Sequence, residues 1–422
     1  MLAQKSIPNA DLDLLFVIDD SATMADKQQA LAAAFPAFIA ELATAEGGLP
    51  SLHIGVVSSD MGTSGSDGTV APQIGQPGAG GCAMTGKAGV LQTNGAPIDG
   101  TFITDLQLSG GSRQTNYTGT LADVFAQMAQ LGTTGCGFEQ HLAAMRAGLS
   151  NPANTGFRRA GANLAVVILG DEDDCSVKNT TFFGPESTTL GPLDSFRCFR
   201  FGVECSPDEP NVVGSKTGCK PRAASDFMDD VAPFRTFLAE QQPDARQLMV
   251  GVLAGATSPV AVELVSPPGG GTPRPSLAAS CTFASTTGEA KSVPGIRLAA
   301  LLDGLPARTH FEPLCSPDLA PAMTALAENA KPLVGDTCLA IAIADTSADP
   351  GLQPDCVLVE TRDSAPDQPQ EIPACDLSSS GTCFRLVEDR ARCASGQGLR
   401  LDVQRAVPAA ADAWLSLRCR LP

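Results

Sequence analysis

The sequence predicts an α/β fold: a doubly wound, mostly parallel sheet with long disulfide-bonded loop insertions and a small C-terminal β module. Three observations support this prediction. Apolar strand patterns alternate with helical patterns through roughly the first 335 residues, which is typical of βαβ crossovers. Three long polar segments each follow an apolar strand. Beyond about residue 335, helical periodicity gives way to short alternating runs separated by Pro, Gly and Ser.

The strands expected in the central sheet are short apolar runs bounded by turn residues. The first, Leu12–Ile18, is almost wholly apolar, as expected of a strand buried on both faces of a parallel sheet. The other expected strands are Leu52–Ser58, Leu164–Leu169, Gln247–Leu253 and Thr309–Pro313.

The helices expected between these strands carry apolar residues at helical spacing. In the segment Asp26–Leu42, the side chains of Phe35, Phe38 and Ile39 share one face. The remaining helices are expected at Thr120–Gln130, Glu139–Leu149, Asp226–Glu240, Ile296–Leu302 and Asp318–Asn329. Strands spaced in this way by helices indicate a sheet covered on both faces.

The chain divides into a tether at 1–10, a main domain at 11–335 and a disulfide-stapled β module at 336–422. The main domain carries insertions at 60–99, 173–225 and 256–294, and each follows the end of an apolar strand. In an open α/β sheet the carboxyl ends of the strands form one edge, where ligands bind. All three insertions are therefore expected at that edge.

Composition limits the function further. Hydrophobic residues make up 43% of the chain and can bury a sizeable core, and the formal net charge is −18. Phosphate contacts need clustered Lys and Arg, so neither nucleic acid nor an anionic membrane surface is an expected partner. The 14 cysteines include no CxxC pair, which favours disulfides in an exported protein over zinc or thioredoxin-like sites.

No membrane-spanning segment is expected, because no run of 18 or more apolar residues occurs. The opening residues MLAQKSIPNA lack the apolar core of a signal peptide. We therefore expect that a signal was removed and that Met1 was added. Any attachment to a membrane is expected only through a removed lipid anchor.

One short motif carries candidate chemistry. Asp19, Ser21 and Thr23 place side-chain oxygens at alternate positions directly after the first strand. A helix N-cap is one interpretation, because Asp, Ser and Thr all cap well. A cation site is the other, because Mg²⁺ takes about six oxygens near 2.1 Å and accepts hydroxyls and waters beside one or two carboxylates.

Partners for such a cation should come from other loops at the same edge. LGTTGCGFEQ (131–140) places Thr133 and Thr134 just before a helix, and Asp171 comes shortly after the strand LAVVIL. These three loops together resemble the metal-ion-dependent adhesion site of von Willebrand factor A (VWA) domains. The resemblance implies a doubly wound, Rossmann-like fold with Mg²⁺ at its upper edge, Mn²⁺ or Ca²⁺ being possible substitutes.

By this resemblance the metal ligands are Asp19, Ser21, Thr23, Thr134 and Asp171, with Thr133 as the alternative to Thr134. The third loop departs from the family, because Glu172, Asp173 and Asp174 follow Asp171 where Gly is common. Whether one cation or two bind there stays open. Asp173 and Asp174 are expected to be solvated or to stiffen the loop through calcium.

A closer likeness is to disulfide-rich myxobacterial envelope lipoproteins, including integrin-like gliding-motility adhesins. The phrases that carry it are LDLLFVIDDSATM, LHIGVVSSDMGT, GCGFEQHL, DEDDCS and LQPDC…CFRLV. The resemblance implies an exported protein at the cell surface or outer membrane. It would act in gliding motility or surface attachment, capturing an acidic side chain of a protein or surface ligand through the cation.

Two alternatives to adhesion remain. The first is a structural envelope component whose metal site only stiffens loops. The second is a hydrolase using paired carboxylates among Glu172, Asp173 and Asp174, although a non-enzyme is expected. The histidines His53 and His141 are expected to be structural.

Cysteine pairing cannot be read from one sequence, but some pairs are favoured. Short-range candidates are Cys205–Cys219, Cys281–Cys315 and Cys375–Cys383. A Cys175–Cys198 bridge would anchor the loop beside Asp171. A Cys82–Cys136 bridge would link the first insertion to the segment 131–140 that carries Thr133 and Thr134, called the Thr loop below; the alternative is that these two cysteines pair elsewhere.

Overall fold

The structure is a computed structural model of the 422-residue chain. It describes residues 2–7, 11–45, 48–108, 112–159, 162–242, 245–266, 270–285, 288–334, 339, 342–346, 353–362, 365–376, 381–388, 390, 397–404 and 413–422.

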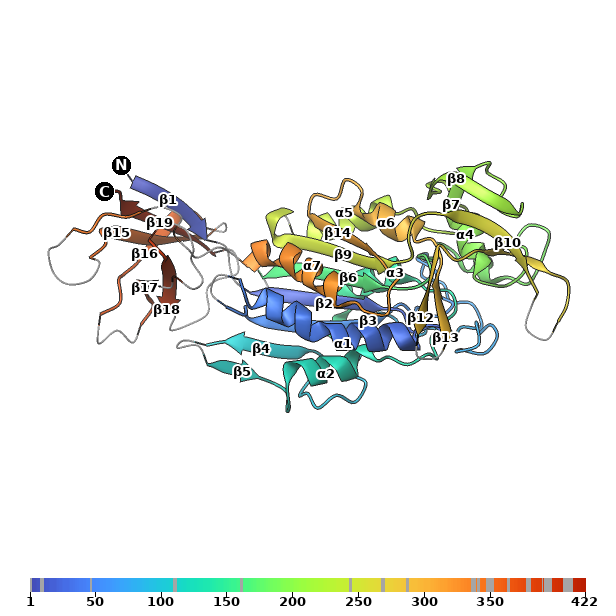
Figure 1. Cartoon of the computed structure of the whole chain (residues 1–422), viewed down its shortest axis with the longest axis horizontal. Coiled ribbons are helices and arrows are strands. Elements are labelled where there is room, and N and C mark those ends of the chain that lie inside the picture. Colours follow the sequence, from blue (N-terminus) through green and yellow to red (C-terminus); the bar gives the residue numbers. More distant parts are fainter. Residues whose placement is uncertain are drawn as a thin grey trace.

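A seven-stranded sheet forms the centre of the molecule, in the order β14-β9-β6-β2-β3-β4-β5 (Figure 1). Strands β14, β9, β6, β2 and β3 are mutually parallel, and β4 and β5 form an antiparallel edge. Their bounds are β2 Leu12–Ile18, β3 Leu52–Ser58, β4 Ile103–Gln107, β5 Arg113–Thr115, β6 Asn163–Leu169, β9 Leu248–Ala254 and β14 Arg308–Pro313. This order confirms the doubly wound, mostly parallel sheet. The chain leaves β2 on one side to form β3 and later returns on the other side to form β6, so the switch point lies where β2 ends.

Helices cover both faces of this sheet, as predicted (Figure 1). One face carries α1 (Ala25–Leu42), α2 (Leu121–Ala129) and α7 (Ala320–Ala330), and the other carries α3 (His141–Ser150), α5 (Ala232–Gln241) and α6 (Ile296–Leu302). Strand β2 serves both cores because successive side chains of a strand point to opposite faces. Phe16 packs with α1 and α2, whereas Leu15 and Val17 pack on the other side.

Helices α3 and α5 begin later than their patterns predicted, for identifiable reasons. Helix α3 begins at His141 because the N–H of Gln140 donates to the carbonyl of Ser59 at 3.1 Å instead of entering the helix. Helix α5 begins at Ala232 because a turn precedes it, in which Ser225 Oγ accepts from the N–H groups of Phe227 and Met228. Short 3₁₀ segments lie at Pro152–Asn154, Thr180–Phe183, Ala245–Gln247 and Lys331–Val334.

The insertions follow the carboxyl ends of β3, β6 and β9, and they lie at one edge of the sheet as predicted (Figure 1). The second and third contain structure that the sequence patterns did not reveal, because strands β8 and β10 from the two insertions pair with each other. The sheet β11-β10-β8-β7 results, together with the hairpin β12-β13. The bounds are α4 Phe196–Gly202, β7 Val203–Ser206, β8 Gly214–Pro221, β10 Val260–Val265, β11 Arg274–Leu277, β12 Cys281–Ser285 and β13 Gly288–Ser292.

The C-terminal part is a β module with its own core, at the opposite end of the molecule from the insertions (Figure 1). The short alternating runs expected in this part of the sequence, CVLVETR, CFRLVEDR, LRLDVQR and WLSLRCRL, form β15, β17, β18 and β19, and β16 completes the set. Their bounds are β15 Cys356–Arg362, β16 Ala365–Ile372, β17 Cys383–Glu388, β18 Leu399–Gln404 and β19 Ala413–Arg420.

The segment expected to be a tether contributes to this module. Strand β1 (Leu2–Ile7) pairs antiparallel with β19, which satisfies the backbone groups of an otherwise open sheet edge. Residues 8–10, the expected domain boundary at 335–336, and the cysteines Cys338 and Cys393 lie outside the described residues.

Six disulfides are present among the described residues. All five favoured pairs are confirmed: Cys82–Cys136, Cys175–Cys198, Cys205–Cys219, Cys281–Cys315 and Cys375–Cys383. The sixth, Cys356–Cys419, joins β15 to β19. This density is typical of an oxidising, extracytoplasmic compartment. Within the described chain, no helix combines the length and apolar character needed to cross a bilayer.

Candidate functional site

The candidate site lies at the switch point, where hydrogen bonds join the loop after β2 to the ends of the neighbouring strands β3 and β6. The N–H of Asp19 donates to the carbonyl of Leu169 at the end of β6, 2.9 Å away. The N–H of Ser59 donates to the carbonyl of Ile18 at 3.1 Å. The ends of β2, β3 and β6 therefore hold the first loop in one defined position.

The Thr loop is docked against this first loop. Gln28 of α1 donates to the carbonyls of Asp19 (2.8 Å) and Gly132 (2.9 Å), and it accepts from the N–H of Gly132 at 3.1 Å. The N–H of Gly135 donates to the carbonyl of Asp20 at 2.9 Å. The side chains of Thr23 and Thr134 are exposed, whereas Thr133 is half-buried. The structure brings the Thr loop to the site but does not select between the two threonines.

Three side-chain oxygens of the predicted ligands are buried and have no hydrogen-bond partner: Asp19 Oδ2, Ser21 Oγ and Asp171 Oδ1. Each carboxylate has its other oxygen engaged. Asp19 Oδ1 accepts from the N–H of Ser21 at 2.7 Å, and Asp171 Oδ2 contacts Lys27 Nζ at 2.7 Å. Buried polar atoms normally find partners, so these three oxygens are the atoms of the predicted ligands that remain available for a further interaction.

Lys27 is a member of the site that the sequence analysis did not identify. Its ammonium group bonds Asp171 and the carbonyl of Thr23 (3.0 Å), and the side chain is 2% exposed. Phe283, from the third insertion, lies 6.0 Å from Nζ by its ring centroid. Lys27 comes one helical turn after Thr23, and this spacing is the signal that could have placed it.

Asp20 has a structural role that differs from that of its neighbour Asp19. Its carboxylate accepts from Ser58 Oγ at 2.6 Å and pairs with Lys87 of the first insertion. Both oxygens are therefore engaged. Asp20 connects the first loop to the first insertion and to the Thr loop.

Glu139 and His141 also lie in this cluster and were not assigned to the site from sequence. Glu139 Oε2 and both ring nitrogens of His141 are buried without partners, and His141 Nε2 is 4.0 Å from Asp19 Oδ2. The ring of His141 packs on Gly170, where a Cβ would lie 2.2 Å from Nε2. The sequence signal that could have identified Glu139 was its position between the Thr loop and the helix that follows.

The electrostatics of the cluster follow from burial and mutual repulsion. Burial raises the pKa of Asp19 well above its usual range, and the charges of Asp171 and Asp20 add to the shift. Burial likewise raises the pKa of Glu139, with the charge of Glu172 next in importance. Burial, assisted by the charge of Asp171, raises the pKa of Glu172 to about 7. Burial and mutual repulsion thus favour the neutral forms of these carboxyl groups, and a positive charge bound among them would favour the ionised forms.

The expectation that Asp173 and Asp174 are solvated or calcium-bound is wrong. Asp174 forms an ion pair with Arg297 at 2.9 Å in which both side chains are 0% exposed, and it accepts from the N–H of Leu142 at 2.9 Å. Asp173 accepts from the N–H groups of Arg297 and Leu298 at the start of α6. Both acids fix the third loop to neighbouring helices.

Two disulfides brace the same region. The Cys82–Cys136 bridge ties the first insertion to the Thr loop, as anticipated. The Cys175–Cys198 bridge anchors the loop that follows Asp171. The loops that carry the candidate ligands are thus cross-linked to the insertions that surround them.

The metal itself stays a prediction. Across the described parts of the chain, no group of three or more His, Cys, Asp or Glu side chains converges in a way that could hold a metal ion. The predicted set contains only two carboxylates, Asp19 and Asp171, and otherwise hydroxyls. The unpartnered oxygens of Asp19, Ser21 and Asp171 are the feature that fits a divalent cation, which takes carboxylates, hydroxyls and waters together.

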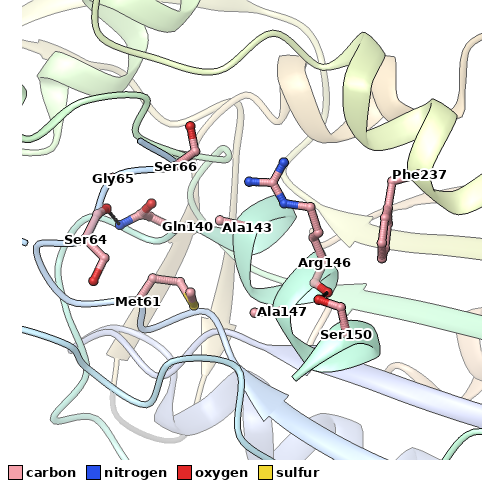
Figure 2. A pocket seen from close by; sticks show the side chains of 10 residues that line it. All are labelled: Met61, Ser64, Gly65, Ser66, Gln140, Ala143, Arg146, Ala147, Ser150 and Phe237. Atoms are coloured by element: carbon pink, nitrogen blue, oxygen red, sulfur yellow. Dashed lines mark hydrogen bonds between the residues drawn. The ribbon is translucent and has the colours of Figure 1, made fainter. Parts of the chain in front are cut away.

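A cavity of about 320 Å³ lies beside the cluster, between the loop after β3, helix α3 and helix α5 (Figure 2). Figure 2 shows Arg146 between Ser66 and Phe237, and Gln140 beside Ser64. Gln140 lines this cavity, whereas Glu139 and the predicted ligands do not. The cavity is thus distinct from the acidic cluster.

The fold and the disulfides define a doubly wound α/β protein consistent with an extracellular binding protein. No protein-family model matches the chain, and no curated protein matches it. Among solved structures, the chain is similar to a von Willebrand factor type A protein from Catenulispora acidiphila, with a TM-score of 0.30 and 10% sequence identity. The alignment covers 100% of this chain, which spans 65% of that chain. The fold class is therefore stated from the strand order of this chain alone.

Proposed function

We propose that this protein is an exported adhesion or binding protein that captures a carboxylate of its partner through a divalent cation, Mg²⁺ in the first place. The proposed ligands are Asp19, Ser21 and Asp171, with hydroxyls from Thr23 and from Thr134 or Thr133. The observation that carries the proposal is the set of three buried oxygens without partners, supplied by two loops.

The charge and exposure of the site support this assignment. Neutral hydroxyls and few carboxylates would leave a bound divalent cation with residual positive charge, and the cation would offer an open coordination position to an outside carboxylate. Thr23 and Thr134 are exposed, so that the site reaches the surface. The insertions around it would then select the partner by shape.

The cellular setting extends this proposal. Disulfide-rich insertions suit a protein that works outside the cytoplasm. By the resemblance described above, we place it at the cell surface or outer membrane of a bacterial envelope, held by a lipid anchor, in gliding motility or surface attachment.

The first experiment is calorimetric titration of the metal-free protein with MnCl₂. One site should be filled by the wild type and lost in Asp19→Asn and Asp171→Asn. Asp402→Asn, which changes a half-buried acid of the C-terminal module that pairs with Arg385, is the matched control and should bind as the wild type does. Absence of any Mn²⁺ binding by the wild type would reject the proposal.

The second experiment tests carboxylate capture. Bound Mn²⁺ relaxes the protons of its exchanging waters, so acetate should lower the relaxation enhancement by displacing a water, while neutral acetamide should not. If Mn²⁺ binds and raises the melting temperature but acetate changes nothing, the site only stiffens loops, and the structural envelope alternative is favoured.

We propose no catalytic role. Hydrolysis by the acidic loop would need free paired carboxylates, and Asp173 and Asp174 are engaged by Arg297 and by the start of α6.

A further inference from the structure

The position of Lys27 raises a question that the proposed ligands do not answer. Its ammonium group bonds Asp171 Oδ2, while Asp171 Oδ1 stays unpartnered beside it. A lysine that is 2% exposed among acids brings a fixed positive charge to the place where a cation is proposed. Lys27 differs in this respect from Lys87, which pairs with Asp20 outside the predicted ligand set and is 26% exposed.

We infer that Lys27 is a resident counter-ion of this site that sets how weakly the site holds a divalent cation. The inference deepens the proposed function and rests on it. The Lys27 ammonium engages only one oxygen of Asp171, so the other oxygen, which has no partner, remains available to the proposed cation. Its charge repels that cation at close range, and burial limits the screening of this repulsion.

The packing keeps the lysine in place. The carbonyl of Thr23 accepts from Nζ at 3.0 Å, and the ring of Phe283 covers the ammonium from the third insertion. The hairpin that carries Phe283 is cross-linked by the Cys281–Cys315 disulfide. Lys27 therefore cannot leave for solvent without opening this cover.

A charge count shows the consequence. In the ionised forms that ligate a cation, Asp19 and Asp171 together with Lys27 carry a net charge of −1, so the site becomes +1 with a divalent cation bound; without the lysine, the corresponding sums are −2 and 0. The number of ligand charges tunes cation affinity in proteins, down to dissociation constants of roughly 10⁻⁴–10⁻³ M in extracellular modules. Lys27 thus lowers the affinity of the site for the cation. It also leaves the occupied site with a net positive charge that can attract an acidic partner.

The test compares MnCl₂ titrations of wild type, Lys27→Met and Lys27→Gln by calorimetry, with folding checked by circular dichroism. Lys27→Met removes the charge, and Lys27→Gln removes it while keeping a donor for Asp171. Both should bind Mn²⁺ at least tenfold more tightly than the wild type. Lys331→Met, which removes a lysine paired with Glu41 away from the site, is the matched control and should leave the affinity unchanged.

Thermal unfolding in EDTA supplies a second measurement. Lys27→Met should melt at a lower temperature than the wild type, because Asp171 loses the partner of its second oxygen, and Mn²⁺ should restore the melting temperature. Adding Asp19→Asn to Lys27→Met should abolish this restoration.

The outcomes separate the two proposals. Tighter Mn²⁺ binding by the Lys27 variants than by a wild type that itself binds supports the inference. Equal or weaker binding by variants of a wild type that binds overturns the inference and leaves the proposed function standing. Absence of binding in all proteins overturns both.

Discussion

Replacing Arg297 by Met should destabilise the main domain strongly, because the third loop is held by a buried ion pair. Arg297 donates to Asp174 at 2.9 Å and to the carbonyl of Asp229 at 2.7 Å, and its side chain is 0% exposed. Breaking a buried pair from one side leaves an uncompensated charge and costs about 3–5 kcal/mol. Hydrogen bonds from Leu142 and Ser176 to Asp174 survive and place the expected loss toward the lower end.

The assay is equilibrium unfolding in urea, followed by far-ultraviolet circular dichroism. Arg385→Met in the C-terminal module is the control: its pair with Asp402 is 2.8 Å long but Arg385 is 53% exposed, so the loss should stay under about 1 kcal/mol. Adding Asp174→Asn to Arg297→Met should cost less than the sum of the single changes, because the two groups interact. A loss under about 1 kcal/mol for Arg297→Met would show that Asp174 is solvated and the reasoning wrong.

Three further predictions concern the loops around the site. Replacing both Cys82 and Cys136 by Ala should lower the free energy of unfolding by about 4 kcal/mol, because the bridge closes a loop with a sequence separation of 54 and so restricts the unfolded chain. The same change should weaken Mn²⁺ binding. Unchanged Mn²⁺ binding would show that the bridge does not position the Thr loop. Gly135→Ala should lower the melting temperature, because its Cβ would lie 2.2 Å from Asp20 Oδ1, whereas Gly381→Ala meets nothing within 4 Å and should be neutral. In EDTA, stability should fall as pH rises from about 4.5 to 7 and level off above that, because the raised pKa values of Glu172 and Asp173, both about 7, make the folded state bind more protons than the unfolded one in this range. Urea midpoints measured across this range should show the slope, and Glu172→Gln should reduce it; a rise in stability with pH would contradict the assignment.

The order of strands and helices could be predicted because it is a property of local patterns. The apolar run Leu12–Ile18 and the amphipathic segment after it carry their periodicity in the sequence, and the structure places both as expected. The antiparallel edge β4-β5 was missed because its short strands alternate weakly and depend on pairing with β3. The pairing of β8 with β10 was missed for a similar reason, since two separate insertions supply the partners.

At the site, the sequence alone determined which residues offer side-chain oxygens and which loops present them. Asp19, Ser21 and Asp171 follow the ends of buried strands, and parallel strands bring such ends to one edge. Only the tertiary structure decided how each charge is matched. Asp20 and Asp19 are neighbours with the same side chain, yet Asp20 meets Lys87 from a distant insertion while Asp19 keeps an unpartnered oxygen.

The same holds for the third loop, where four consecutive acids, residues 171–174, are equivalent in sequence. Arg297 comes more than a hundred residues later and engages Asp174, and Lys27 comes from α1 and engages Asp171. The reason is physical: local sequence fixes backbone direction and the side chains a loop offers, whereas the pairing of a buried charge depends on which distant segments fold against it.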